Sequence, residues 1–179
     1  TEEATVPVSG RFQIGDLYYI LNGDDMTAAV TYRYLSQGHA NYSLNEINVP
    51  SQVTYQNNTY DVTSVGDSAF CYIYVNTYIT LPNSVTSIGS NAFENCNSLQ
   101  SVTLPSDITS IGLGAFRNSR SLTSIYAASL ESWLDMEVGD YAFPSSYDLY
   151  FNNVKAESLS IPQSTVSIGD NAFNGCRSI

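Results

Sequence analysis

Few side chains in this chain belong to the types that carry out catalysis, and they lie far apart in the sequence. His39 is the only histidine and falls in the polar run SQGHANYS. A Ser–His or Cys–His nucleophile would have to be built around this one imidazole, and nothing beside it suggests a partner. We therefore expect no enzyme activity.

The carboxylates and thiols that could hold a metal lack the spacing of metal sites. Acids gather in one stretch, at Glu131, Asp135, Glu137, Asp140 and Asp148. Their order lacks the D-x-D-x-D-G ligand pattern of a calcium loop, so we interpret them as a solvated acidic loop. Cys71, Cys96 and Cys176 have no paired ligand spacing for zinc. We expect neither a metal nor a cofactor.

Charge and hydropathy argue against two classes of partner, nucleic acids and membranes. The chain has 17 acids against 6 bases, a net charge of −11. Nucleic acid and anionic membranes are poor partners for it, because phosphate binding needs clustered Lys and Arg. No run approaches the roughly 20 apolar residues of a spanning helix, so we expect no membrane insertion in this segment. Residues 1–10 have no signal-peptide pattern and are interpreted as disordered or linker; any export signal was removed or never present.

An internal repeat is the strongest feature of the chain. SVTSIGSNAFENCNSL at 84–99, DITSIGLGAFRNSRSL at 107–122 and STVSIGDNAFNGCRSI at 164–179 are three copies of one pattern. The interval from Phe70 to Phe93 equals that from Phe93 to Phe116, whereas the interval from Phe116 to Phe173 is longer. A fixed period of this kind indicates a solenoid of stacked coils.

Alternation within each copy predicts which side chains face the core. Leu99, Val102 and Leu104 have the L-x-x-L-x-L spacing of a strand with an apolar inner side, and Pro105 ends it. Stacked in register, such strands form a parallel sheet, with equivalents at Ile79 and Leu81, Leu122 and Ile125, and Leu159 and Ile161. Four phenylalanines are expected to stack as a spine: Phe70, Phe93, Phe116 and Phe173.

One position of the repeat is occupied by Ile73, Cys96, Ser119 and Cys176. A site that accepts these residue types is a small packed slot, in which a free cysteine behaves as a small hydrophobe. Two sulfurs several coils apart cannot reach disulfide distance, so we expect Cys96 and Cys176 to be unpaired.

Both ends of the array and one coil depart from the repeat. Residues 11–61 are predicted to form an N-terminal β cap and entry coil, with a hairpin around NGDD at 22–25 and a tight turn at Asn57 and Asn58. Repeats follow over 62–179, with an irregular coil at about 127–156 in which Ser129 caps a short helix and 138–143 is a decayed copy. Ile179 aligns with Leu99, so the repeat stops partway, and we expect an end-to-end or dimer contact there unless a longer array continues it.

These strings resemble the BspA-like leucine-rich repeats of bacterial surface proteins. The signature I-G-x-x-A-F-x-x-C-x-S-L is complete at 88–99, has Ser119 for Cys in the next copy and Ile179 for Leu in the last. The resemblance covers 62–179, and 47–66 resembles the entry of the same family. It implies a curved solenoid, surface display or secretion by a bacterium, and adhesion to host proteins or other microbes. No functional residue carries over, because the shared positions are core positions.

The predicted fold is mainly β with short helical turns: one continuous domain, a right-handed leucine-rich-repeat solenoid of about 23-residue coils with an N-terminal hairpin cap. A noncatalytic, extracellular interaction module that binds a protein or glycan is our leading interpretation, and a structural spacer without its own ligand is the alternative. The outward side chains of the sheet are the candidate binding face: Tyr78, Thr80, Ser101, Thr103, Ser124, Tyr126, Ser158 and Ser160.

Overall fold

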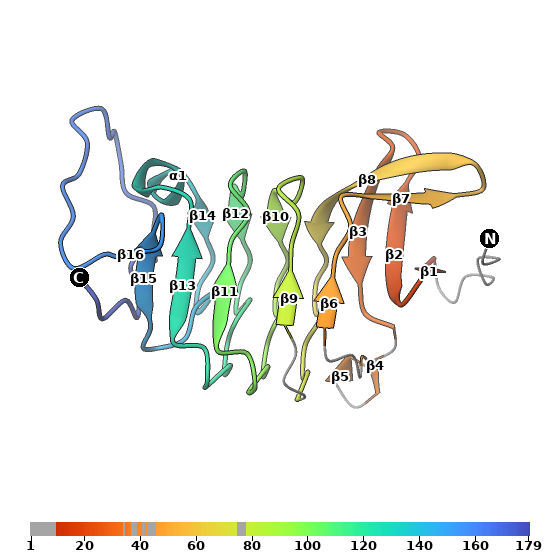
Figure 1. Ribbon diagram of the computed structural model, residues 1–179, viewed down its shortest axis with the longest axis horizontal. Coiled ribbons are helices and arrows are strands. Elements are labelled where there is room, and N and C mark those ends of the chain that lie inside the picture. The colour runs from red at the N-terminus through yellow and green to blue at the C-terminus, as the bar shows by residue number, and fades with distance from the viewer. Residues whose placement is uncertain (1–9, 34, 37–38, 41, 43–45, 75–77) are drawn as a thin grey trace.

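The computed structural model describes residues 10–33, 35–36, 39–40, 42, 46–74 and 78–179. The segment expected to be disordered or a linker, 1–10, lies outside the described residues except for Gly10. Strands connected by turns make up the fold, and the helix α1 spans only Leu130–Leu134. Figure 1 shows the coils stacked along one axis between the two termini. The mainly β class is thereby confirmed.

The strands are short, as expected for narrow coils. In chain order they are β1 Phe12–Ile14, β2 Leu17–Asn22, β3 Thr27–Thr31, β4 Leu35–Ser36, β5 His39–Ala40, β6 Glu46–Asn48, β7 Gln52–Tyr55, β8 Asn58–Val65, β9 Tyr78–Thr80, β10 Ser87–Ile88, β11 Ser101–Thr103, β12 Ser110–Ile111, β13 Ser124–Ala127, β14 Glu137–Val138, β15 Asp148–Phe151 and β16 Val154–Lys155.

Each coil contributes a strand to a parallel ladder formed by β8, β10, β12 and β14. Ser87 pairs with Ser64 on one side and with Ser110 on the other, so successive strands are offset by one repeat of constant length. Ser110 then pairs with Glu137, which is a larger offset. The inner residues of this ladder, Ile88 and Ile111 among them, are buried. The larger offset shows that the fourth strand belongs to a longer coil.

A second set of parallel strands lies on the other side of the coils (Figure 1). β11, β13 and β15 form one ladder, in which Ser101 pairs with Ser124 and Ser124 with Asp148. The antiparallel strand β16 covers the outer edge of β15. β6 and β9 form a separate parallel pair. We call the outward surface of β11, β13 and β15 the front face.

The hairpin predicted near the N-terminus is present as β2 and β3, with Tyr19 opposite Val30. The single run expected over 12–21 is instead two strands, because the chain reverses at Gly15, whose φ is +59°. The tight turn predicted at Asn57 and Asn58 lies one residue earlier, since Gln56 and Asn57 have the positive φ angles and Asn58 already pairs with Tyr55.

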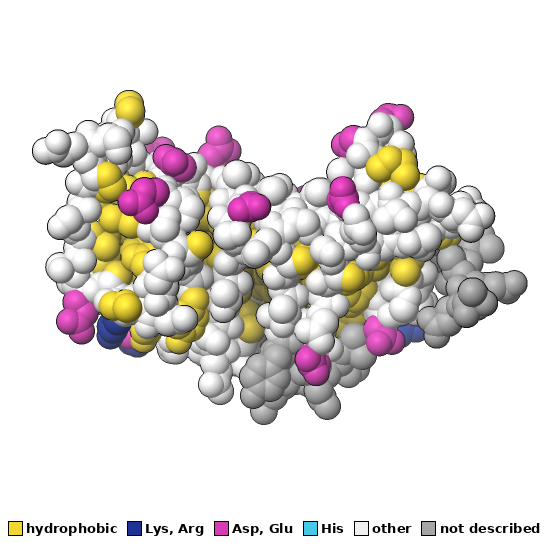
Figure 2. All heavy atoms as spheres, turned by 45° about the horizontal axis from the view of Figure 1, so that its top comes forward, with side chains coloured by type: hydrophobic (Ala, Val, Ile, Leu, Met, Phe, Trp, Pro, Cys, Tyr) yellow, Lys and Arg dark blue, Asp and Glu magenta, His cyan; other side chains and the backbone are white. Residues whose placement is uncertain are grey.

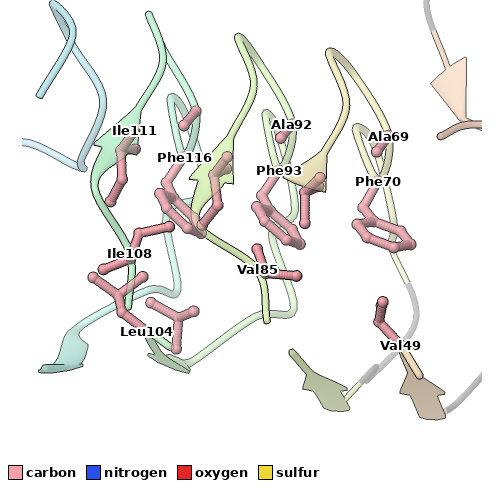
Figure 3. Packing of buried hydrophobic residues seen from close by; sticks show 14 of the residues in the cluster. Val49, Ala69, Phe70, Val85, Ala92, Phe93, Leu104, Ile108, Ile111 and Phe116 are labelled. Carbon is pink, nitrogen blue, oxygen red and sulfur yellow. The ribbon is translucent and has the colours of Figure 1, made fainter. Parts of the chain in front are cut away.

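Phenylalanines stack through the core with parallel rings (Figure 3). Ring centroids of Phe70 and Phe93 are 5.3 Å apart, and those of Phe93 and Phe116 are 4.9 Å apart. The next member is Phe143, at 5.8 Å from Phe116, which confirms that 138–143 is a diverged copy. The expectation that Phe173 follows Phe116 directly is therefore wrong.

Trp133 separates the last copy from the rest of the spine. The helix predicted after Ser129 is present, and the Ser129 hydroxyl accepts a hydrogen bond from the Ser132 N–H at 3.1 Å. The indole stacks on Phe143 at 5.4 Å and lies 6.4 Å from Phe173. Its Nε1–H donates to the Ala172 carbonyl, whereas in earlier coils the equivalent carbonyl accepts the backbone N–H of a phenylalanine. Trp133 therefore occupies the place that direct coil stacking would use.

The last copy consequently stacks through its turn and not through a strand. The strand predicted at Leu159 and Ile161 is absent, and 165–168 does not pair with β14. Ile168 is 48% exposed, while its counterpart Ile88 is 2% exposed. Figure 1 shows this stretch extending away from the stacked coils.

The slot shared by Cys96 and Ser119 links neighbouring coils. The Cys96 thiol donates to the Phe70 carbonyl at 3.0 Å, and the Ser119 hydroxyl donates to the Phe93 carbonyl at 2.7 Å. The small packed slot is confirmed, with a hydrogen bond that composition did not indicate. Cys96 and Cys176 are unpaired by any disulfide, as expected. Burial raises the pKa of Cys96 to about 12.

Truncation of the central spine residue, Phe93→Ala, should lower the free energy of unfolding by about 3–5 kcal/mol. The ring is buried and stacks against rings on both sides, so its loss leaves a cavity that neighbouring coils cannot fill. Urea denaturation followed by circular dichroism measures this loss. Leu113→Ala, at a half-exposed side chain, is the control and should change stability little. Equal stabilities of both variants would contradict the spine as a source of stability.

Cys96 should resist alkylation by iodoacetamide in the folded chain at neutral pH. Its raised pKa keeps the thiol protonated, and the thiolate is the reactive form. Mass spectrometry of digested protein should show modification of Cys96 only after urea unfolds the chain, with the more exposed Cys176 reacting earlier. Equal modification rates of Cys96 in native and unfolded protein would show that the slot opens.

Candidate functional site

The predicted binding residues on β11 and β13 do share the front face. Val102 and Ile125 are buried, so the residues on either side of each point outward. Ser101 is in register with Ser124, and Thr103 with Tyr126. The period-two alternation in the sequence therefore predicted correctly that these four side chains point outward on the same face.

The other predicted residues have different outcomes. Thr80 is exposed in β9, which pairs with β6. Tyr78 belongs to β9, but its side chain lies outside what the structure describes. Ser158 and Ser160 are exposed and lie outside any strand, so placing them on the sheet is corrected here. Their binding role, like that of the whole set, stays a prediction.

The place expected for Ser158 and Ser160 is occupied by β15, because the fourth coil has a shorter turn. Eight residues lead from Phe116 to Ser124, the start of β13, whereas five lead from Phe143 to Asp148, the start of β15. The strand DLYF, β15, therefore begins three residues closer to its phenylalanine than β13 does. The chain then reverses at Asn152 and Asn153 and covers that edge with β16.

Two tyrosines form the centre of the front face. Tyr126 and Tyr150 are direct partners in the ladder, and their rings stack with centroids 4.7 Å apart and planes 23° apart. Both side chains are half-buried. Aromatic neighbours across parallel strands stabilise the sheet while leaving their outer surface available for contact. The pair is an aromatic platform next to the hydroxyls of Thr103 and Ser124.

One acid on this face is neutralised by two bases. The Asp148 carboxylate accepts hydrogen bonds from Lys155 Nζ and from Arg177 Nε, each at 2.9 Å. These bonds, Arg177 first, hold the pKa of Asp148 below its ordinary value. The front face near Tyr150 therefore carries one excess positive charge in a chain whose net charge is −11.

Sequence reasoning did not place Tyr150 and Asp148 on the front face. The available signal was the alternation in DLYF, where Leu149 is buried between two outward residues. It was overlooked because the L-x-I-P string at 159–162 matches the repeat pattern in letters. The match to the repeat pattern favoured 159–162, but the length of the preceding turn places β15 in the sheet.

The predicted acidic loop is largely exposed, with Glu131, Asp135, Glu137 and Asp140 all at the surface. Asp148 is the exception, since it is half-buried and paired. Figure 2 shows acids distributed over the visible face, with Lys and Arg seen only near its lower margin. In the residues that the structure describes, no three His, Cys, Asp or Glu side chains lie close enough together to hold a metal ion.

Within the same residues, no helix has the length and apolar content needed to pass through a bilayer.

A groove of about 700 Å³ runs along the other ladder, lined by the outward serines and the glycines that follow each strand. The glycines are required by close approach of the coils. A Cβ on Gly89 would lie 2.5 Å from Asp67 Oδ1 and 2.7 Å from the Asp67 backbone nitrogen. The Asp67 carboxylate also accepts a hydrogen bond from the Ser90 N–H at 2.7 Å. This repeated backbone contact explains the groove as a consequence of coil stacking.

Parallel strands offset by one coil, a continuous aromatic spine and a slot that bonds back to the preceding coil define a leucine-rich-repeat protein. The chain belongs to the BspA type leucine rich repeat region family, whose model matches six copies over residues 39–150 and 145–179.

Solved structures of bacterial leucine-rich-repeat proteins have the same fold. A protein from Bacteroides ovatus is 30% identical with a TM-score of 0.64, over 90% of this chain and 38% of that one. A protein from Bacteroides capillosus is 27% identical with a TM-score of 0.60, over 82% and 95%. A leucine rich cell surface protein from Faecalibacterium prausnitzii is 26% identical with a TM-score of 0.53, over 98% and 54%. This chain thus spans little more than a third of the B. ovatus protein. No curated protein matches it.

Proposed function

We propose that this chain is a noncatalytic interaction module that binds an extracellular protein or glycan through its front face. The observation that carries the proposal is the Tyr126–Tyr150 stack, an aromatic platform in an otherwise hydroxyl-rich strip. Tyrosine is enriched among the residues that dominate binding energy at interfaces. Solenoids also present their sheets as extended binding surfaces.

The location that suits this function is the outside of a bacterial cell, either attached to the surface or secreted. The description of the F. prausnitzii relative as a cell surface protein supports this part of the proposal. Adhesion to a host or microbial molecule is the activity we assign to such a location.

The proposed architecture is a right-handed solenoid with a cap at 11–61, regular coils of constant length and an irregular coil at about 127–156. Support comes from the ladder offset, which is the same from β8 to β10, from β10 to β12 and from β11 to β13. It also comes from the pairing of β3 with β8, which places the hairpin beside the first regular coil.

A spacer without its own ligand is the second candidate function. The small hydroxyl side chains on the front face favour this function. Ser101 and Thr103 are exposed to solvent, and such polar side chains suit the outer side of a strand whether or not a ligand binds there. The two functions differ in whether the front face binds anything.

Substitution of both platform residues, Tyr126→Ala with Tyr150→Ala, should weaken binding to the ligand at least about tenfold, as loss of an interface hot spot does. The assay is direct binding of the folded chain to a panel of extracellular-matrix proteins and glycans at physiological salt. Melting temperature is measured alongside, since both rings are half-buried and fold loss must be separated from ligand loss.

The control is Leu113→Ala, at an exposed side chain outside the front face, which should keep binding of the same ligand. A ligand lost in the control but retained by the double variant binds elsewhere and contradicts the front-face assignment. Absence of binding to every panel member, by folded wild-type chain, would favour the spacer.

We also propose that copies of the chain contact one another through the last repeat. Ile161 and Ile168 occupy core positions of the repeat but are exposed by 42% and 48%, and Val166, close to Ile168 in the chain, is exposed by 99%. Figure 2 shows hydrophobic side chains gathered at this end of the molecule. An exposed apolar surface of this kind is typical of association sites.

Sedimentation velocity across the micromolar range should therefore show a concentration-dependent dimer. Val166→Ser with Ile168→Ser should return the chain to a monomer, because the apolar contact is removed at side chains that the fold does not bury. A wild-type chain that stays monomeric over this range would contradict the contact.

A further inference from the structure

A pocket of about 450 Å³ lies between the turn of the third regular coil and the shortened turn of the next one. It is lined by Arg117, Asn118, Ser119, Arg120, Tyr141, Phe143, Pro144, Ser145 and Ser146. Its volume is in the range of small-ligand pockets, about 300–1,000 Å³. The pocket shares no residue with the front face.

The pocket exists because the fourth coil lacks part of the turn that earlier coils have. Seven residues, 117–123, separate Phe116 from β13, whereas only 144–147 separate Phe143 from β15. The shortened turn packs instead against the last copy, where a Cβ on Gly175 would lie 2.3 Å from the Pro144 carbonyl oxygen. The surface of the 117–120 turn that a full-length neighbour would cover is thus left open.

One backbone donor in the pocket has lost its usual acceptor. The Tyr72 N–H donates to the Glu94 carbonyl, and the equivalent Asn95 N–H donates to the Arg117 carbonyl at 2.9 Å. The next equivalent is Asn118, and among the described residues its N–H has no acceptor. Asn118 lines the pocket, so this single N–H is available to a ligand acceptor.

Two arginines line this pocket, and one of them has its charge balanced by an acid. Arg117 and Arg120 are two of the six Lys and Arg residues of the chain. Arg117 donates through Nε and Nη2 to one Glu94 oxygen, at 2.9 and 2.7 Å, which fixes its side chain in place. Arg120 makes no ion pair with any described residue. A guanidinium without a carboxylate partner is suited to bidentate binding of a ligand carboxylate.

Tyr141 adds an exposed aromatic ring held in a strained backbone conformation. Its φ is +56°, and the equivalent residues of other coils with similar angles are Ser68, Asn91, Gly114 and Asn171. Small or amide residues tolerate this region, whereas a bulky aromatic residue is an outlier there. The ring is 69% exposed, so core packing does not offset the strain.

We propose that this pocket binds a carboxylate-bearing sugar, such as a uronic or sialic acid residue of a glycan. Arg120 and the Asn118 N–H receive the carboxylate, and Arg117, held by Glu94, forms part of the pocket wall. Tyr141 contacts the face of the sugar ring, and the Ser145 and Ser146 hydroxyls contact its hydroxyl groups. A carboxylated sugar fits better than an acidic peptide because the lining combines a single aromatic ring with several hydroxyls around one anionic position.

The chain itself supplies the matched substitutions for a test. Arg120→Asn introduces the residue that the preceding coil has at Asn97, and Tyr141→Asn introduces the residue found at Asn91 and Asn171. Both should fold, and Tyr141→Asn should keep or raise the melting temperature because asparagine tolerates positive φ. A purely structural role for Tyr141 would instead lower it.

The probes are trigalacturonic acid and 3′-sialyllactose, with maltotriose and lactose as neutral counterparts, titrated calorimetrically into the folded chain. We expect saturable binding of at least one acidic sugar, none of the neutral sugars, and affinity at least about tenfold weaker in Arg120→Asn, in line with the loss of a charge-assisted bidentate contact. Tyr141→Asn should weaken binding by a smaller factor. The front-face variant Tyr126→Ala should bind as wild type does.

Three outcomes would overturn the proposal. Neither acidic sugar binds to the folded chain; binding is unchanged in Arg120→Asn; or a hexaglutamate peptide binds more tightly than both acidic sugars, which would make the pocket a site for acidic peptides. Because the front-face variants are measured with the same probes, failure of this pocket and failure of the front face are told apart.

Discussion

Backbone hydrogen bonds from each regular coil to the preceding coil are the interactions on which the structure depends. The Thr109 N–H donates to the Thr86 carbonyl and the Gly112 N–H to the Ile88 carbonyl, each at 2.8 Å. The same two bonds recur one repeat earlier, from Thr86 to Thr63 and from Gly89 to Val65, so they fix the register between neighbouring coils. Stacked phenylalanines and the close approach at Gly89 follow from that register.

Most of the core could be predicted from sequence because the register repeats. Once the period is known, the position of Phe93 predicts that of Phe116, and alternation around Val102 predicts which neighbours point outward. The diverged copy ending at Phe143 was also recognisable, since it keeps the glycine and the A-F pair. These features depend on local pattern, which a single sequence contains in full.

The fourth coil and its neighbours could not be placed in the same way. Residues 159–162 match the strand pattern of the repeat, but β15 occupies that position in the sheet because the turn before it is three residues shorter. The local sequence pattern does not show which of the two segments joins the sheet. The short helix after Ser129 was predicted, but the insertion of its Trp133 between Phe143 and Phe173 depends on contacts distant in sequence. For the same reason Tyr126 was identified as a surface candidate and its partner Tyr150 was not.

The wedge formed by Trp133 also has a mechanical consequence. Pulling along the solenoid axis loads the bonds between coils, and the regular coils share that load among several ladder bonds at every junction. At the junction beyond β14, the described residues on the strand side form no such ladder bond. Among them, the Val138 carbonyl accepts a hydrogen bond from the Asn171 side-chain amide, at 3.5 Å. The molecule therefore has a built-in weak joint, at which the array would extend first under tension while the coils on its N-terminal side keep their shape.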